Sequence, residues 1–350
     1  MNALQRNTLL FVESLVYGFS YGALRCLIRQ PEPLDPQWTW GLINRRLPPF
    51  LDWWRLHYPP LLVRRLLLAS RMKQEHKLGI AEHYDVSNEF YKLFLDRKYM
   101  FYSCADFLRG DETLEEAQTA KADFLLKLID PHAGEKILDL GCGWGAMLRR
   151  IYEETADKEN LSGYTLGEEQ VAYNSAHDGF HVELKNFITC DYPAGTFDKL
   201  YSIGSWEHVR HRDLAMVLEK LFNALKPGGR MVKHFFCPRS ETVPVAAIVA
   251  QIFFPGSFQP AYPTQVRAFE AAGFRITHQS IHDYRPTLRA WFENLARNRD
   301  AAIGLVGVET YNKYLVFFAA SWRFFNESES ILVRFVLEKP ERDIPGRETL

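Results

Sequence analysis

The stretch KILDLGCGWG, residues 136–145, decides the fold class of this chain. It begins with the short apolar run KILDL and continues into the glycine-rich turn GCGWG, and residues 146–154 then have the pattern of a helix. A strand, a glycine turn and a helix in this order bring backbone N–H groups to the end of the strand, where a ligand can approach them closely. The stretch therefore predicts a nucleotide-type cofactor site.

The same alternation continues through the rest of the chain. Further apolar runs predict strands at 161–166, 182–188, 199–203, 230–235, 274–281 and 331–337. Helices are predicted between them, at 168–176, 214–225, 264–272, 287–298 and 310–326. Such alternation predicts an α/β fold, a Rossmann-like doubly wound sheet that is mostly parallel and covered by helices on both faces. A Pro-Gly-Gly sequence at 227–229 predicts the end of the helix that precedes the fifth strand, and residues 237–262 are long enough to form an inserted lid.

The residues around the glycine turn distinguish between two kinds of cofactor. A nicotinamide enzyme is expected to have an acidic residue about 20 positions after the turn. Here the second strand ends GYTLG, and Thr165 and Gln170 offer neutral groups for ribose hydroxyls instead. Asp139, which only Leu140 separates from the glycines, is more typical of S-adenosylmethionine enzymes, and Asp191 and Tyr192 follow the third strand, where an adenine contact is expected.

Composition excludes several classes of protein. Lys and Arg total 42 against 43 Asp and Glu, so there is no overall positive charge to attract nucleic acid. The 5 cysteines contain no Cys-x-x-Cys pair, which argues against a disulfide framework or a metal site and favours a reducing, cytoplasmic setting.

The first 75 residues have a different surface from the remainder. They hold ten basic and five acidic side chains and four of the 8 tryptophans, a combination that the interface of a bilayer attracts. The apolar run at 9–24 contains Glu13 and is shorter than a membrane span, and it lacks the features of a secretory signal. Two compatible interpretations remain: a helical cap docked on the rest of the protein, or a segment that contacts a membrane surface.

Several motifs in order resemble one enzyme family. They are HYDVSNEFY at 83–91, YSCA at 102–105, LDLGCGWG at 138–145, YTL at 164–166, IG at 203–204 with EHV at 207–209, and FPG at 254–256. Together they are similar to the cyclopropane-fatty-acyl-phospholipid synthases and their mycolic-acid relatives, over residues 79–338. The resemblance implies a methyltransferase domain at 76–340, after the segment 1–75 and before a tail at 341–350.

This resemblance implies a class I S-adenosylmethionine-dependent methyltransferase that adds carbon to the double bond of an unsaturated acyl chain. It implies cofactor contacts from Tyr102, Ser103, Gly141, Gly143, Thr165, Leu166 and Gln170. It also implies that Cys104, Glu207, His234 and Tyr314 hold a bicarbonate ion. Tyr311 competes with Tyr314 for its role, and Cys104 could contribute only as a small buried side chain that presents backbone groups.

The chemistry explains why such a set is needed. An alkene is a weak nucleophile, so it must be held in line with the sulfonium methyl in a dry pocket. Methyl transfer leaves a carbocation, which aromatic faces can stabilise and a small bound base can deprotonate to close a cyclopropane ring. His234 and Tyr314 could donate hydrogen bonds to bicarbonate, while Glu207 accepts from its hydroxyl.

Some positions depart from the family pattern. Trp206 replaces a phenylalanine, Gly167 replaces a serine, and KHFFC at 233–237 replaces a segment that ends in a small aliphatic residue and glycine. A reshaped pocket leaves open a methylene- or methyl-branched product in place of a ring. The expected partner is an unsaturated acyl lipid or a phospholipid bilayer surface, with peripheral membrane association, and a homodimer remains open. A small-molecule methyltransferase and a non-catalytic S-adenosylmethionine-binding protein are the alternatives.

Overall fold

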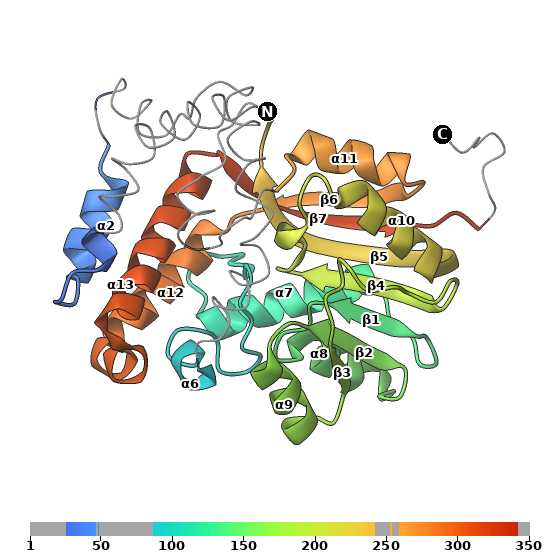
Figure 1. The fold of residues 1–350 in the computed structure, drawn as a ribbon, viewed down its shortest axis with the longest axis horizontal. Helices are drawn as coiled ribbons and strands as arrows, with labels where there is room; N and C mark the ends of the chain where they lie inside the picture. The colour runs from blue at the N-terminus through green and yellow to red at the C-terminus, as the bar shows by residue number, and fades with distance from the viewer. Residues whose placement is uncertain (1–25, 47, 49–86, 242–252, 254–258, 342–350) are drawn as a thin grey trace, which may run out of the picture. The chain divides into compact units, whose positions relative to one another are not determined.

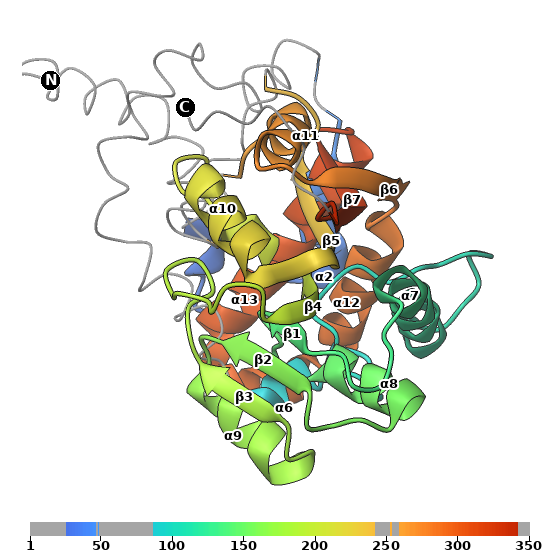
Figure 2. The ribbon, with the colours of Figure 1, turned by 90° about the vertical axis from the view of Figure 1, so that its right-hand side faces the viewer.

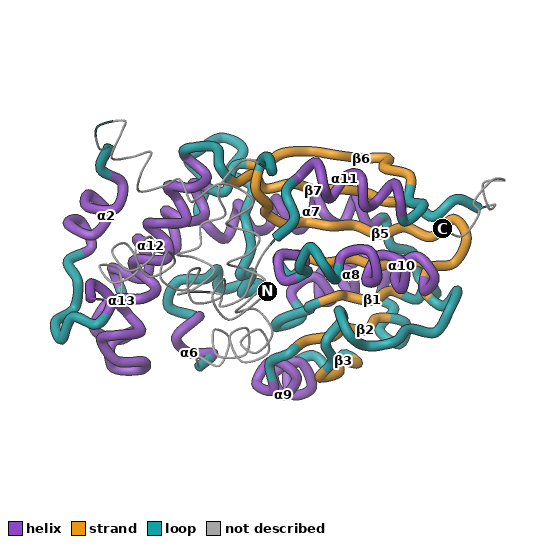
Figure 3. The backbone as a smooth tube through the Cα atoms, turned by 45° about the horizontal axis from the view of Figure 1, so that its top comes forward, coloured by secondary structure: helices purple, strands orange, loops and turns teal. Residues whose placement is uncertain are grey.

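The computed structural model describes residues 26–46, 48, 87–241, 253 and 259–341 (Figure 1). The chain divides into two compact units. The sheet unit comprises residues 96–239, 259–287 and 330–350, and the helical unit comprises residues 1–95, 240–258 and 288–329. All strands of the described chain, orange in Figure 3, belong to the sheet unit. The expected domain boundary at residue 75, the apolar run at 9–24 and the tail from 342 onwards lie outside the described residues.

The sheet unit contains a seven-stranded sheet in the order β3-β2-β1-β4-β5-β7-β6. Its strands are β1 (Ile137–Leu140), β2 (Leu161–Thr165), β3 (His181–Leu184), β4 (Phe197–Ile203), β5 (Leu225–Pro238), β6 (Arg275–His282) and β7 (Ser330–Glu338). The strands β3, β2, β1, β4 and β5 pair in parallel, whereas β7 is antiparallel to both β5 and β6. The predicted α/β doubly wound fold is confirmed. Its antiparallel strand, β7, lies between β5 and β6.

Helices cover both faces of this sheet. Figure 2 shows α7 (Leu114–Ile129) and α8 (Ala146–Thr155) on one side and α10 (Leu214–Ala224) on the other, with α11 (Tyr262–Ala271) near the upper edge. Helix α9 (Glu168–His177) contacts β2 and β3. Helix α7 begins at a capping box, in which Thr113 and Glu116 each satisfy the backbone N–H of the other. The alternation of strands and helices does not predict α7, because this helix precedes the first strand.

Several predicted element ends are wrong, and the last helix, for example, begins at Arg299 and not at residue 310. The third strand was expected to reach residue 188 but ends at Leu184, because the Asn186 side chain accepts a hydrogen bond from the backbone of Ile188 and turns the chain. Helix α10 ends at Ala224, before the Pro-Gly-Gly sequence, but the fifth strand begins at Leu225 and not at residue 230, and it runs through that sequence. The pairing of β5 with β4 is irregular beside the Pro-Gly-Gly sequence, and Gly228 has a φ of 77°. The strand therefore accommodates these residues in a bulge.

The helical unit is organised around α13 (Arg299–Asn326), which is broken at Gly307, where φ is 78°. Helix α2 (Pro36–Asn44) packs on α13, as does α6 (Asn88–Tyr91), and most of α12 (Arg285–Arg297) belongs to the same unit. The Arg323 guanidinium donates to the carbonyls of Ile43 and Arg45, so a side chain of α13 fixes the end of α2. In the part of the chain that the structure describes, no helix combines the length and the apolar character needed to cross a membrane.

Candidate active site

Three glycines of the turn between β1 and α8 adopt the left-handed backbone conformation that favours glycine. Gly141, Gly143 and Gly145 have φ values of 103°, 54° and 73°. A Cβ on Gly141 would lie 2.4 Å from the Ser205 Cβ, and a Cβ on Gly145 would lie 2.0 Å from an oxygen of Asn174. A side chain at Gly141 or Gly145 would therefore clash with its neighbours, and the turn presents its backbone at the carboxyl end of β1.

Asp139 lies in β1 directly before this turn. Its side chain is buried, and burial raises the pKa of the carboxyl group well above its usual range, while the neighbouring Tyr201 hydroxyl acts in the opposite direction. Among the described residues, no group makes a hydrogen bond to Asp139 Oδ1. A buried acceptor without a partner beside a glycine turn fits the ammonium group of a bound amino acid moiety.

The remaining predicted cofactor residues follow β2 and β3. Thr165 Oγ1 donates to Gln170 Oε1, both side chains are buried, and Leu166 is exposed. The Tyr192 hydroxyl donates to the Phe187 carbonyl at 2.6 Å. Asp191 is almost fully exposed, and its carboxylate pairs with Lys220 at 2.9 Å.

Asn174 on α9 was not among the predicted residues. Its amide donates to the Gly143 carbonyl at 2.9 Å and so holds the glycine turn from a second element. Asn174 is fully buried on α9. The sequence gives no signal for this role, because it does not show which face of the helix is covered.

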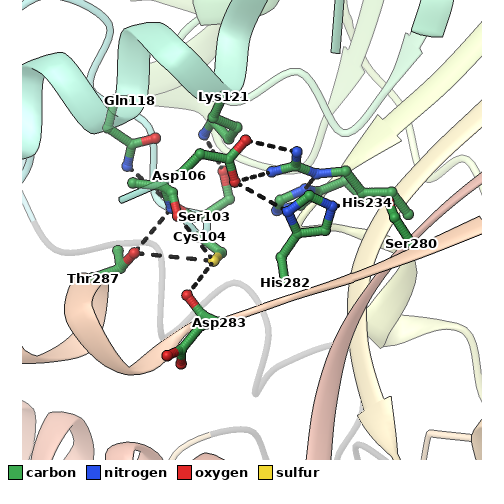
Figure 4. A network of polar contacts seen from close by, with 12 residues as sticks. Ser103, Cys104, Asp106, Gln118, Lys121, His234, Ser280, His282, Asp283 and Thr287 are labelled. Carbon is green, nitrogen blue, oxygen red and sulfur yellow. Dashed lines mark hydrogen bonds and ion pairs between the residues drawn. The ribbon is translucent and has the colours of Figure 1, made fainter. Parts of the chain in front are cut away.

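The segment with Ser103 and Cys104 is held by helix α7 and by the loop before α12 (Figure 4). Gln118 donates to the Ser103 carbonyl at 3.0 Å, and Lys121 Nζ lies 2.9 Å from Ser103 Oγ. The Cys104 sulfur lies 3.5 Å from the Asp283 carbonyl, and burial raises the pKa of its thiol to about 12. Cys104 is therefore a thiol at neutral pH and not a nucleophile. Tyr102, the first residue of the motif, is half-buried.

Glu207 lies in a short 3-10 helix, η1 (Trp206–His208), which follows β4. Its Oε1 accepts a hydrogen bond from the backbone N–H of Phe236 at 3.2 Å, and burial raises its pKa to about 8. Two of the positions that depart from the family pattern meet here, since Lys233 Nζ lies 3.0 Å from the centre of the Trp206 ring. Lys233 is fully buried, and burial lowers its pKa well below the usual range.

His234 lies in β5 and belongs to a buried polar cluster (Figure 4). Its Nδ1 accepts from Arg334 Nε at 2.9 Å, and its Nε2 has no hydrogen-bond partner within the described parts of the chain. Arg334 donates two further bonds of 2.7 Å to Asp106, and His282 Nδ1 lies 3.3 Å from the same carboxylate. Burial, and then the positive charges around it, lower the pKa of His234 well below its usual range, so the ring is neutral.

Four residues in and beside this cluster, Lys121, Asp106, His282 and Arg334, were not predicted. A signal for two of them exists in the sequence. Lys121 interrupts the buried stripe of α7, and Arg334 interrupts the apolar run of β7, which is buried along nearly its whole length. A charged side chain at such a position is expected to have a buried partner, but its identity depends on the fold.

Tyr314 belongs to the helical unit, whereas Cys104, Glu207 and His234 belong to the sheet unit. Its hydroxyl oxygen lies 3.0 Å from that of Tyr91, and burial raises its pKa. Within the sheet unit, the structure brings Cys104 and His234 into one polar network, and Glu207 contacts the strand of His234 two residues further on, at Phe236.

A family model described as mycolic acid cyclopropane synthetase matches residues 71–335. Cyclopropane mycolic acid synthase 3 of Mycobacterium tuberculosis is 32% identical over 286 residues, which cover 75% of this chain and 98% of that protein. A probable fatty acid methyltransferase of Pseudomonas putida is 32% identical over 290 residues, which cover 78% of this chain and 72% of that protein.

Solved structures give the same result. The cyclopropane synthase MmaA2 from Mycobacterium tuberculosis matches with a TM-score of 0.70 and 29% identity, over 75% of this chain and 98% of that one. The mycolic acid cyclopropane synthase CmaA1 in complex with SAH and CTAB matches with a TM-score of 0.68, 29% identity and the same coverage.

Proposed function

The chain belongs to the mycolic acid cyclopropane synthetase family, and on that premise we propose that it adds a methylene or methyl group to the double bond of an unsaturated fatty acyl chain. Membership makes it an S-adenosylmethionine-dependent methyltransferase of class I fold. The observation that carries the proposal is the buried set of Cys104, Glu207 and His234, in which His234 Nε2 has no hydrogen-bond partner among the described residues.

The residues at the carboxyl ends of β1 and β2 fit S-adenosylmethionine. Asp139 would accept from its ammonium group, the backbone at Gly141 and Gly143 would line its amino acid end, and Thr165 and Gln170 would bind ribose hydroxyls. When bound, this cofactor supplies an electrophilic methyl group. Because Asp139 is buried, an ammonium partner would stabilise its ionised form and lower the raised pKa of its carboxyl group.

The sheet unit also fits a small anionic base such as bicarbonate. His234 Nε2 is a buried donor that an anion would satisfy, and Glu207 lies against the adjoining part of β5. With a pKa of about 8, Glu207 is mostly protonated at neutral pH when no other group is bound, so it can donate as well as accept a hydrogen bond. These residues would orient the base that removes a proton from the alkylated substrate.

The direct test is a labelling experiment. A host that expresses the chain receives isotope-labelled methionine, and its total fatty acids are analysed by mass spectrometry against a vector control and a His234→Gln control. A labelled acyl chain that has gained one CH2 supports the proposal, and fragmentation separates ring from branch. No labelled acyl product, despite S-adenosylmethionine binding by the purified protein, would favour a small-molecule substrate.

We also propose that residues 26–46 contact the surface of a phospholipid bilayer. On α2, Trp40 packs against Phe292 and Trp322 at ring distances of 4.8 and 5.2 Å, so one side of the helix docks on the helical unit. Trp38 and Leu42, one turn apart, are 53% and 45% exposed. Exposed tryptophan and leucine in a segment with excess arginine match a bilayer interface.

Vesicle co-sedimentation tests this contact with the full chain. The double variant Trp38→Ser/Leu42→Ser is expected to bind vesicles of anionic phospholipid more weakly than the wild type. Leu108→Ser is the matched control, because Leu108 is 77% exposed but lies in the sheet unit. Equal binding by all three proteins would contradict the proposal.

A further inference from the structure

A row of polar side chains crosses the antiparallel end of the sheet. His234 on β5 faces Arg334 on β7, and Arg334 faces Ser280 on β6 in the register of the two ladders. Residues that face one another across neighbouring strands project from the same side of a sheet. The ring of Phe124, on α7, lies 5.0 Å from the Arg334 guanidinium carbon, so α7 covers this row.

Every nitrogen of the Arg334 guanidinium has a hydrogen-bond partner. Its two terminal nitrogens donate to the two oxygens of Asp106, and its Nε donates to His234 Nδ1. The side chain has no exposed surface. A bidentate ion pair with a buried carboxylate fixes the plane of a guanidinium, which in turn fixes the direction of its third donor.

An arginine donor determines which ring nitrogen of a histidine acceptor carries the hydrogen. The guanidinium stays protonated in proteins, so the nitrogen that faces it must be the one without a proton. In a neutral imidazole the other nitrogen then carries the hydrogen, and the hydrogen bond to one ring nitrogen sets the role of the other.

We propose that Arg334 is a positioning residue that holds His234 with its hydrogen on Nε2, so that His234 acts as a hydrogen-bond donor and not as a base. The inference rests on the proposed function and deepens it, because it leaves deprotonation of the substrate to the bound anion or to Glu207. Protonation of Nδ1 would set two N–H groups against each other at 2.9 Å. Burial, and then the positive charge of Arg334, lower the pKa of His234 and oppose a second proton on the ring.

The tautomer can be measured without any turnover. In protein labelled with 15N-histidine, long-range 1H–15N spectra distinguish the protonated from the unprotonated ring nitrogen, and loss of signals in His234→Gln assigns the residue. The expected wild-type result is an unprotonated Nδ1 and a protonated Nε2 across neutral pH. A proton on Nδ1 would overturn the proposal, and this outcome needs no variant of Arg334.

The double variant Arg334→Met/Asp106→Asn removes the donor without leaving a buried charge unpaired. We expect its His234 signals to show a mixture of tautomers, and we expect kcat to fall about 10- to 100-fold, as for other groups that orient a functional histidine. S-adenosylmethionine affinity should not change. Arg230→Met is the control, since Arg230 pairs with Glu338 on the same two strands but is remote from His234.

The experiments distinguish a wrong role for Arg334 from a wrong proposed function. An unaltered tautomer in the double variant, or an equal loss of kcat in Arg230→Met, would overturn the role of Arg334. A wild-type protein that makes no acyl product would overturn the proposed function, while the spectra would still decide the tautomer.

Discussion

The parallel part of the sheet and its antiparallel end both bring polar groups into the protein interior, but by different means. At β1 the polar groups are backbone amides of a glycine turn and one carboxyl group, all within residues 139–145. At β5, β7 and β6 they are side chains in mid-strand, and the two that bond, His234 and Arg334, are 100 residues apart. A local motif produces the first kind of site, whereas strand register produces the second.

The two regions also differ in how their carboxyl groups are stabilised. Burial opposes the ionisation of Asp106, but hydrogen bonds from His282 and Arg334 outweigh it and lower its pKa to about 2. Glu207, in the short helix η1 after the parallel strand β4, accepts a hydrogen bond from the backbone of Phe236, but burial outweighs it and raises its pKa to about 8. One carboxylate therefore contributes a fixed charge, whereas the other can exchange a proton near neutral pH.

The largest expected effect comes from the exchangeable carboxyl group. Glu207→Gln should lower turnover by about 10²- to 10⁴-fold, the range for loss of an acid–base group, while S-adenosylmethionine affinity measured by calorimetry stays the same. Glu159→Gln, at an exposed position, is the control. Equal activity of the Glu207 variant and the control would refute a role for this carboxyl group in catalysis.

The second prediction concerns Asp106, the fixed negative charge at the antiparallel end of the sheet. Asp106→Asn should lower the free energy of unfolding by about 3–5 kcal/mol, because Arg334 then loses a buried counter-charge. Urea denaturation measures the change. Adding Arg334→Met should recover much of the loss, since neither buried charge then remains; a double variant less stable than Asp106→Asn would argue against this explanation.

Two glycines test the local motif. Gly141 and Gly134 both have positive φ values, 103° and 85°, but only Gly141 has an atom where a Cβ would lie. Gly134→Ala should lower the free energy of unfolding by roughly 1–2 kcal/mol, the cost of a left-handed alanine. Gly141→Ala should cost more and should also weaken S-adenosylmethionine binding in calorimetry. Similar losses of stability and unchanged binding in both variants would contradict the steric argument.

The last prediction is a pair of opposite pH dependences in stability. Asp106 has its pKa lowered from 3.8 to about 2, so it contributes roughly 2 kcal/mol that is present above pH 3.8 and lost as pH falls through 2. Glu207 has its pKa raised from 4.5 to about 8, so its contribution is present below pH 4.5 and lost as pH rises through 8.

Urea denaturation of the wild type, Asp106→Asn and Glu207→Gln over this pH range separates the two contributions. The stability gap between the wild type and Asp106→Asn should narrow from pH 4 to pH 2. The stability of the wild type relative to Glu207→Gln should fall between pH 4.5 and pH 8. A gap that is independent of pH in either comparison would show that the group has the same pKa in the folded and unfolded chains.

Much of the parallel region could be predicted from the sequence. Apolar runs identify β1, β2, β4 and β5, and the sequence GCGWG locates the turn, because strand period and glycine conformation are local properties. The element ends at Leu184 and Leu225 could not be predicted, since a single side-chain hydrogen bond and a bulge decide them. Helix α7 is a further omission, and with it the positions of Gln118 and Lys121 behind Ser103.

The sequence by itself determined the fold class and the glycine turn, and it suggested Cys104 and Glu207, because each belongs to a short motif that can be recognised without knowing its neighbours; His234 was proposed only from the family resemblance. Only the tertiary structure decided that Arg334 faces His234 and that Asp106 and α7 surround them. Partners so far apart in sequence are selected by the antiparallel register of β5 and β7. That register depends on which side chains the sheet buries on each face, and no single segment contains this information.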